Sequence, residues 1–164
     1  MNRTPTILFW CLVALFVSDV LSSTAALPEQ MATHFGRGGM PNGSMSRTGY
    51  VQFMLAFGLG VPFFVVGIHY LLARYAGNQF NIPNREYWLA PERRPATLQL
   101  LLNHSWWLGC LMMLFMMAIH RLLFAINRSS PPSLPTLPFL LLIGSFLAGL
   151  GWWTIVLRTR FRRQ

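Results

Sequence analysis

Four long apolar runs, separated by short polar segments, make up most of this chain. Three are continuous, at Val51–Ala73, Leu98–Ile119 and Leu137–Leu157, and a fourth, Ile7–Leu27, is strongly apolar only as far as Val17. A helix that crosses the roughly 30 Å hydrocarbon core of a bilayer needs about 20 apolar residues at about 1.5 Å each. The pattern predicts an all-α membrane protein with four transmembrane helices, at about residues 7–27, 51–73, 98–124 and 137–157.

The first run has a second interpretation. Its short apolar stretch, followed by Asp19 and by the small residues Ser23-Thr24-Ala25, also fits a cleaved signal peptide. We favour a retained helix, because Ser, Thr and Ala can all end a helix near the membrane interface.

Composition supports lipid as the solvent of this chain. Hydrophobic residues make up 54% of the sequence and charged residues only 10%, which is too few for the surface of a soluble domain of 164 residues. The net charge is +9, and every basic residue is an arginine. The arginines sit at the ends of the apolar runs and form no stripe, so they indicate membrane orientation and not a nucleic-acid partner.

The arginines also predict the direction of the helices. With both termini cytoplasmic, nine arginines lie inside and four lie outside or at the outer interface, namely Arg37, Arg47, Arg121 and Arg128. This bias is the one that the positive-inside rule requires, and the inverted topology would place the majority outside.

Under this topology, residues 28–49 form a turn-rich extracytoplasmic loop between the first two helices. Gly36, Gly38, Gly39 and Gly43 permit positive φ, and Pro41-Asn42-Gly43 fits a tight turn. Residues 74–97 form an inner loop, in which Pro91 or Pro95 suits the first turn of the third helix. A proline-rich outer connector (127–138) and a basic cytoplasmic tail after residue 157 complete the chain.

Polar residues inside the spans are few, and Asp19 is the only acid among them. A carboxylate at mid-bilayer is unfavourable by about 2.5–3.5 kcal/mol, so such a group needs a partner. His120 or Arg121 lies at a similar depth on the third helix, and a structural pair with Asp19 is expected.

His69 and His104 fall near the inner ends of their helices. Two histidines without a third ligand are a weak metal signal, and we expect them to be polar residues between helices.

Other side chains in the spans favour packing over chemistry. Met113, Met117 and His120 share one helix face and would suit Cu(I), but methionine is also an ordinary gap-filler, so we expect no metal and no cofactor. Gly144, Ala148 and Gly151 form a small-residue face suited to close helix contact within the chain or in a homodimer. Hydrolase and nucleotide-binding motifs are absent, and we expect no enzyme activity.

The outer segment resembles the signature of the bacterial membrane family called domain of unknown function 1648. The matching positions are Leu27, Pro28, His34, Phe35, Gly39, Pro41, Asn42, Gly43, Ser46 and Arg47. The inner segment Asn81–Arg94 is similar to a second block often found in such proteins, and the resemblance covers about residues 7–125, leaving 126–164 as an addition. Gly36 departs from the family pattern, which commonly has Asn after the aromatic residue.

The resemblance implies a retained first span and a location in the bacterial cytoplasmic (inner) membrane. The family includes immunity proteins of the Sdp type, which protect a cell from its own secreted peptide, and some of them sequester a cytosolic regulator. By this analogy we expect an external peptide or ligand to bind at Pro28, His34, Phe35, Gly39, Pro41, Asn42, Gly43 and Arg47. A cytosolic partner would dock on Pro83, Tyr87, Trp88, Pro91, Glu92, Arg93 and Arg94.

Two other functions remain open from the sequence. A small transporter, or a subunit of one, would use Asp19 and His120, with His69 as a further candidate, to line a path through the membrane. A purely structural subunit of a membrane complex would need neither site.

Overall fold

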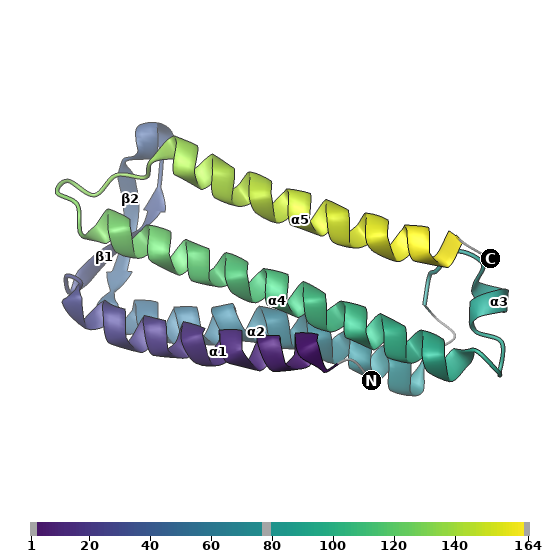
Figure 1. Cartoon of the computed structure of the whole chain (residues 1–164). Coiled ribbons are helices and arrows are strands. Elements are labelled where there is room, and N and C mark those ends of the chain that lie inside the picture. Colours follow the sequence, from purple (N-terminus) through teal and green to yellow (C-terminus); the bar gives the residue numbers. More distant parts are fainter. Residues whose placement is uncertain (1–2, 77–79, 163–164) are drawn as a thin grey trace.

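Four long helices run side by side over most of the structure, a computed structural model that describes residues 3–76 and 80–162 (Figure 1). They are α1 (Thr4–Ser23), α2 (Arg47–Tyr75), α4 (Arg94–Asn127) and α5 (Thr136–Arg162). All four are long and apolar enough to cross a membrane, which confirms the prediction of four helices of membrane-spanning length and composition. Gly77 in the predicted inner loop and Arg163 in the predicted tail lie outside the described residues.

The helices differ from the predicted spans mainly at their ends. The Ser46 side chain caps α2 by accepting a hydrogen bond from the Gly49 amide at 3.1 Å, so this helix begins four residues before the apolar run. Pro95 occupies the first turn of α4, as one of the two alternatives predicted. α1 ends earlier than expected, at Ser23, and a short 3-10 turn, η1 (Thr24–Ala26), follows it.

The structure defines the two ends of the last predicted span. Pro138 was placed both at the end of the connector and inside the span 137–157, and it lies in the first turn of α5, where a proline removes no helical hydrogen bond. The basic tail was expected after residue 157, and α5 continues through it as far as Arg162. A helix extends beyond the hydrocarbon layer when its polar end can be solvated, so the apolar run underestimates its length.

The segment between α1 and α2 is a β-hairpin, so the all-α prediction is wrong at this point. β1 (Gln30–Phe35) pairs antiparallel with β2 (Pro41–Ser46), and a 3-10 turn, η2 (Arg37–Gly39), joins them. Gly38 and Gly39 both have φ of 73°, and the Gly36 amide donates to the Met40 carbonyl oxygen at 2.8 Å. The chain therefore reverses at the glycine pair, which tolerates positive φ without steric strain.

This reversal also corrects the predicted position of the turn. Pro41-Asn42-Gly43 was expected to be a tight turn but forms the first half of β2. A proline is acceptable there because it is the first residue of an edge strand. Among the glycines expected to permit positive φ, Gly36 and Gly43 do not use it.

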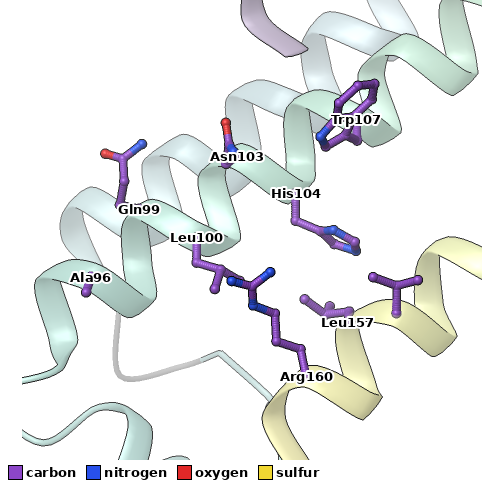
Figure 2. A pocket seen from close by; sticks show the side chains of 9 residues that line it. Ala96, Gln99, Leu100, Asn103, His104, Trp107, Leu157 and Arg160 are labelled. Carbon is purple, nitrogen blue, oxygen red and sulfur yellow. The ribbon is translucent and has the colours of Figure 1, made fainter. Parts of the chain in front are cut away.

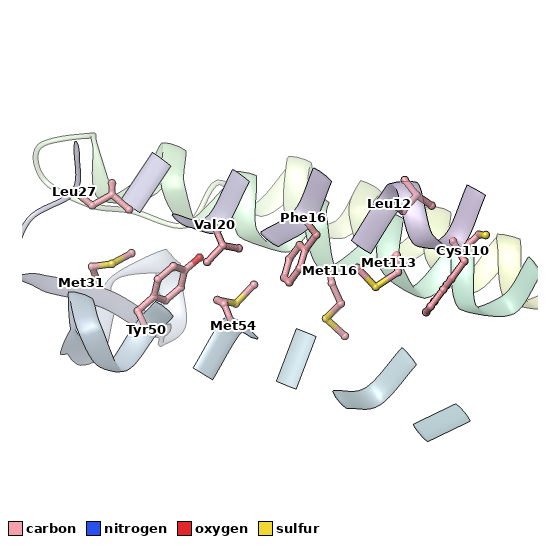
Figure 3. Packing of buried hydrophobic residues seen from close by; sticks show 11 residues of the cluster. Leu12, Phe16, Val20, Leu27, Met31, Tyr50, Met54, Cys110, Met113 and Met116 are labelled. Carbon is pink, nitrogen blue, oxygen red and sulfur yellow. The ribbon is translucent and has the colours of Figure 1, made fainter. Parts of the chain in front are cut away.

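α4 is the central helix and packs against α1, α2 and α5. The main hydrophobic core lies between α1, α2 and α4 (Figure 3). Phe9, Phe16 and Val20 of α1 are fully buried in it. Because Gly58 has no side chain, the Phe16 ring packs directly against α2; a Cβ there would lie 2.6 Å from the ring. The first predicted span is thus an integral member of the bundle. The other members of this core include Leu12, Tyr50, Met54, Cys110, Met113 and Met116.

α5 has a different environment, because it packs mainly against α4. Phe115 and Phe146 stack between the two helices with ring centroids 4.3 Å apart. Gly144, Ala148 and Gly151, the predicted small-residue face, are exposed, and a Cβ at either glycine would meet nothing within 4 Å. This face therefore makes no close helix contact within the described chain.

The two ends of the bundle are distinct. The hairpin covers one end, which we call the hairpin end, and both termini lie at the other, together with the short helix α3 (Arg85–Trp88) (Figure 1). We call this second end the basic end. There Ile82, Leu101 and Phe161 form a small separate core.

Candidate functional site

Three helices meet around the side chain of His120, which is completely buried just below the hairpin. The Tyr50 hydroxyl of α2 lies 2.8 Å from His120 Nδ1, and Ser23 Oγ of α1 lies 2.9 Å from His120 Nε2. The rings of Tyr50 and His120 are stacked, with centroids 5.8 Å apart. One imidazole on α4 thus joins α1 and α2 at the point where both connect to the hairpin.

If the imidazole is neutral, only one assignment of donors and acceptors satisfies all the hydrogen bonds of this group. Ser23 Oγ donates to the backbone carbonyl oxygen of Asp19 at 2.6 Å, so it accepts from His120 Nε2–H. His120 Nδ1 then carries the lone pair and accepts from the Tyr50 hydroxyl. The result is a continuous chain of hydrogen bonds from α2 through α4 to α1, in which each member of the chain is satisfied.

Asp19 completes this cluster and confirms the expected pairing with the third predicted helix. Its Oδ1 lies 2.5 Å from Arg121 Nη2, and its Oδ2 lies 3.9 Å from His120 Nε2. Oδ2 is buried and has no hydrogen-bond partner within the described residues. The Arg121 side chain is 58% exposed, so the carboxylate is neutralised from the bundle surface while its second oxygen faces the imidazole. We call Asp19, Ser23, Tyr50, His120 and Arg121 the His120 network.

A second polar contact fixes the hairpin on α4. The Asn127 side chain accepts from the Ala32 amide at 2.7 Å and donates to the Ala32 carbonyl oxygen at 2.9 Å. It also donates to the Leu123 carbonyl oxygen of its own helix at 2.9 Å. A buried amide that pairs with both backbone groups of one strand residue fixes the strand in position as well as orientation.

Arg47 supports the other side of the hairpin. Its Nη1 donates to the carbonyl oxygens of Leu27 at 2.9 Å and Ala25 at 3.3 Å. Its backbone amide donates to the Glu29 carbonyl oxygen at 2.8 Å. Arg47 was predicted to bind a ligand, but these contacts close the base of the hairpin onto the end of α1.

The remaining predicted ligand residues fall into two groups. Pro28, His34, Pro41 and Asn42 are exposed, whereas Phe35 and Gly43 are half-buried and Gly39 is buried. His34 lies opposite Gly43 in the hairpin. A Cβ added at Gly43 would lie 3.1 Å from the Cβ of His34. The hairpin therefore brings His34 and Gly43 together, and it places Gly39 against the connector at Leu134.

The predicted docking segment at the basic end is partly used for packing. Trp88 Nε1 donates to the Phe161 carbonyl oxygen of α5 at 2.9 Å. Pro83 is half-buried, while Arg93 lies over the Tyr87 ring at 4.0 Å. The exposed part of this surface consists of Tyr87, Pro91, Glu92, Arg93 and Arg94.

The other two membrane histidines each have a backbone partner. His69 lies 2.7 Å from the Val65 carbonyl oxygen of its own helix. His104 Nε2 lies 3.0 Å from the Trp153 carbonyl oxygen, and Trp153 Nε1 donates to the His104 carbonyl oxygen at 2.9 Å. His104 therefore has the expected role of a polar residue between helices, whereas the contact of His69 lies within its own helix. No three His, Cys, Asp or Glu side chains among the described residues form a group that could hold a metal ion.

Sequence reasoning missed Tyr50, Ser23 and Asn127. Tyr50 directly precedes an apolar run, and Ser23 fits either a cleavage site or the end of a helix without indicating a hydrogen-bond partner. Asn127 stands 95 residues from its partner Ala32, and no local signal links the two. A hydrogen-bonding side chain at the same expected depth as His120 is the one signal that could have pointed to Tyr50 and Ser23.

Comparison with known proteins adds no relative, since no family model, curated protein or solved structure matches the chain.

Proposed function

We propose that this protein is a non-enzymatic membrane protein of immunity or signal-receptor type that recognises an extended peptide through its hairpin. The observation that carries this proposal is the fixed position of the hairpin on α4. Asn127 holds β1 through both backbone groups of Ala32, which leaves a rigid element at one end of four apolar helices. Rigid presentation lowers the entropy lost when a ligand binds.

The free edge of the hairpin suits a peptide ligand. The sheet described in the structure has two strands, so β2 has β1 on one side and no third strand on the other. An exposed strand edge presents unpaired amide and carbonyl groups, to which an extended peptide can add as a further strand. Asn42 is exposed on β2 itself and His34 is exposed on the neighbouring strand β1, and both would supply side-chain selectivity.

The His120 network links the hairpin to the helices. Ser23 and Tyr50 lie next to the two points where the hairpin joins α1 and α2, and both bond to His120 of α4. A peptide that displaces the hairpin would change these bonds and so shift α1 and α2 relative to α4. Under the positive-inside topology, the response would reach a cytosolic regulator at the exposed Tyr87 and Arg93.

The test is membrane depolarisation by a panel of envelope-active peptides, in bacterial cells with and without the protein. We expect protection against one peptide, and loss of that protection in His34→Ala and Asn42→Gly at unchanged membrane levels. Gln30→Ala is the matched control, because Gln30 is also exposed and polar but lies at the start of β1. Protection that survives both variants would exclude His34 and Asn42 as recognition residues. Protection that is lost equally in the control would contradict selective recognition at these two residues and indicate a general effect of altering the hairpin.

A transporter is the second candidate, and the His120 network is the observation that favours it. Asp19 Oδ2 is buried without a hydrogen bond and faces His120, an arrangement in which a proton can be held between two titratable groups. Proton-coupled uptake into vesicles containing the protein, abolished in Asp19→Asn, would support this function. The absence of any proton flux would leave the network with a structural role.

A further inference from the structure

A continuous groove runs between α4 and α5, separate from the hairpin and from the His120 network. At the basic end it is a cavity of about 400 Å³, with walls that include Gln99, Asn103, His104 and Arg160 (Figure 2). A second cavity of about 340 Å³ shares His104, Trp107 and Val156 with the first. A third, of about 280 Å³, shares Leu111 with the second.

The walls of this groove change from polar to apolar along its length. The amides, the imidazole and the guanidinium all belong to the first cavity. The second is lined largely by aromatic and aliphatic side chains, among them Trp107, Leu111 and Trp152. The third is lined by leucines, phenylalanines, an alanine and one serine. A groove with a polar end and an apolar continuation matches a molecule that is itself amphipathic.

Arg160 gives the polar end a positive charge. Its side chain extends from α5 toward α4, while the His104 ring projects from α4 toward α5 (Figure 2). The ion pairs of the described chain involve Asp19 alone, so Arg160 has no carboxylate partner there, and no acid lines the cavity. An unpaired arginine at a polar cavity next to lipid favours an anionic group from outside the chain.

The first two cavities together match one leaflet in length, and the third continues the groove beyond them. The first two cavities extend along α4 from Ala96 to Leu111, which corresponds to about 22 Å of helix. Half of a bilayer, counted with its headgroup layer, is about 20–22 Å thick. A phospholipid whose phosphate lies at the polar end would therefore place its acyl chains along the apolar part.

We propose that this groove binds one anionic phospholipid from the leaflet at the basic end. Arg160 contacts the phosphate, and the Gln99 and Asn103 amides lie where the polar part of the lipid enters. The acyl chains lie against Trp107 and Trp152, which are 43% and 69% exposed in the structure. This site is independent of the proposed peptide recognition, because it shares no residue with the hairpin.

Quenching of tryptophan fluorescence tests the proposal. The full chain is placed in phosphatidylcholine vesicles that contain a small fraction of brominated phosphatidylglycerol or, separately, brominated phosphatidylcholine. We expect the anionic lipid to quench with about fivefold higher apparent affinity, the factor equivalent to about 1 kcal/mol for one arginine near an anionic lipid. Arg160→Gln should abolish the preference.

Arg158→Gln is the matched control, because Arg158 lies on the same helix and is exposed but does not line the groove. It should retain the preference, and both variants should keep the helical circular dichroism of the parent. Equal loss in both variants would show general attraction of lipid to a basic helix end and would overturn the proposal. Relief of quenching by millimolar inorganic phosphate would also overturn it, in favour of a site for the free anion.

Discussion

Replacing Asn127 with alanine tests directly how the hairpin is held. The change removes three hydrogen bonds and leaves the amide and carbonyl groups of Ala32, a buried residue, without their partner. Each buried group left unpaired destabilises by about 1–3 kcal/mol. Water gains partial access to the vacated space and reduces this cost. We therefore expect the free energy that favours the docked hairpin over an undocked one to fall by about 2–4 kcal/mol.

Hydrogen exchange of the protein in detergent or nanodiscs measures this loss. The readout is the peptide that covers β2 (Pro41–Ser46), because β2 pairs with β1, whereas the hydrogen bonds of the Asn127 side chain go to Ala32 of β1 and to Leu123. A loss of 2–4 kcal/mol corresponds to exchange faster by about 30-fold to 1,000-fold, with the helices unchanged. Asn103→Ala is the control, since Asn103 is an asparagine of the same helix that lines the groove at the basic end, away from the hairpin.

Unchanged exchange in β2 of the Asn127→Ala variant would refute the reasoning, because it would mean that the hairpin is held without this side chain. Faster exchange across all helices would refute it in a different way, by showing that Asn127 stabilises the whole bundle.

Two pairs of glycine substitutions separate packing from backbone effects. Gly58→Ala places a Cβ 2.6 Å from the Phe16 ring and should destabilise the bundle by about 1–3 kcal/mol in thermal or denaturant unfolding, whereas Gly60→Ala, with nothing within 4 Å, should be neutral or slightly stabilising. Gly39→Ala combines a φ of 73° with a Cβ 2.5 Å from a carbonyl oxygen of the connector, and Gly38→Ala has the same φ without the clash. Exchange in β2 should therefore rise more in Gly39→Ala than in Gly38→Ala, and equal effects would mean that the contact with the connector is unimportant.

The helices were predictable because lipid imposes a simple rule on the sequence. A segment in the bilayer must satisfy its own backbone and present apolar side chains, so composition and length suffice to locate it. Asp19 was predictable for the same reason, since a lone acid among apolar residues requires a partner at its depth, and Arg121 supplies it.

The hairpin, and Ser23 and Tyr50 of the His120 network, were not predictable, because they depend on contacts between distant parts of the chain. β1 has no clear alternation of apolar and polar residues, and its position is fixed by Asn127, 95 residues away. Tyr50 and His120 are 70 residues apart and meet only after the helices pack. Local sequence patterns carry no information about such pairs.

The attachment of α5 has a consequence for how this protein assembles. Besides the ring contact with α4, three separated hydrogen-bonded contacts hold the last part of the chain: Leu134, in the connector before α5, bonds to Gly39, Trp153 of α5 pairs with His104, and Phe161 of α5 bonds to Trp88. The partners in the first and third contacts belong to the hairpin turn and to the segment before α4, so these contacts form only once those parts are in place. Biogenesis should therefore follow a fixed order, in which α1, α2 and α4 associate first and α5, inserted last, docks laterally onto a finished surface.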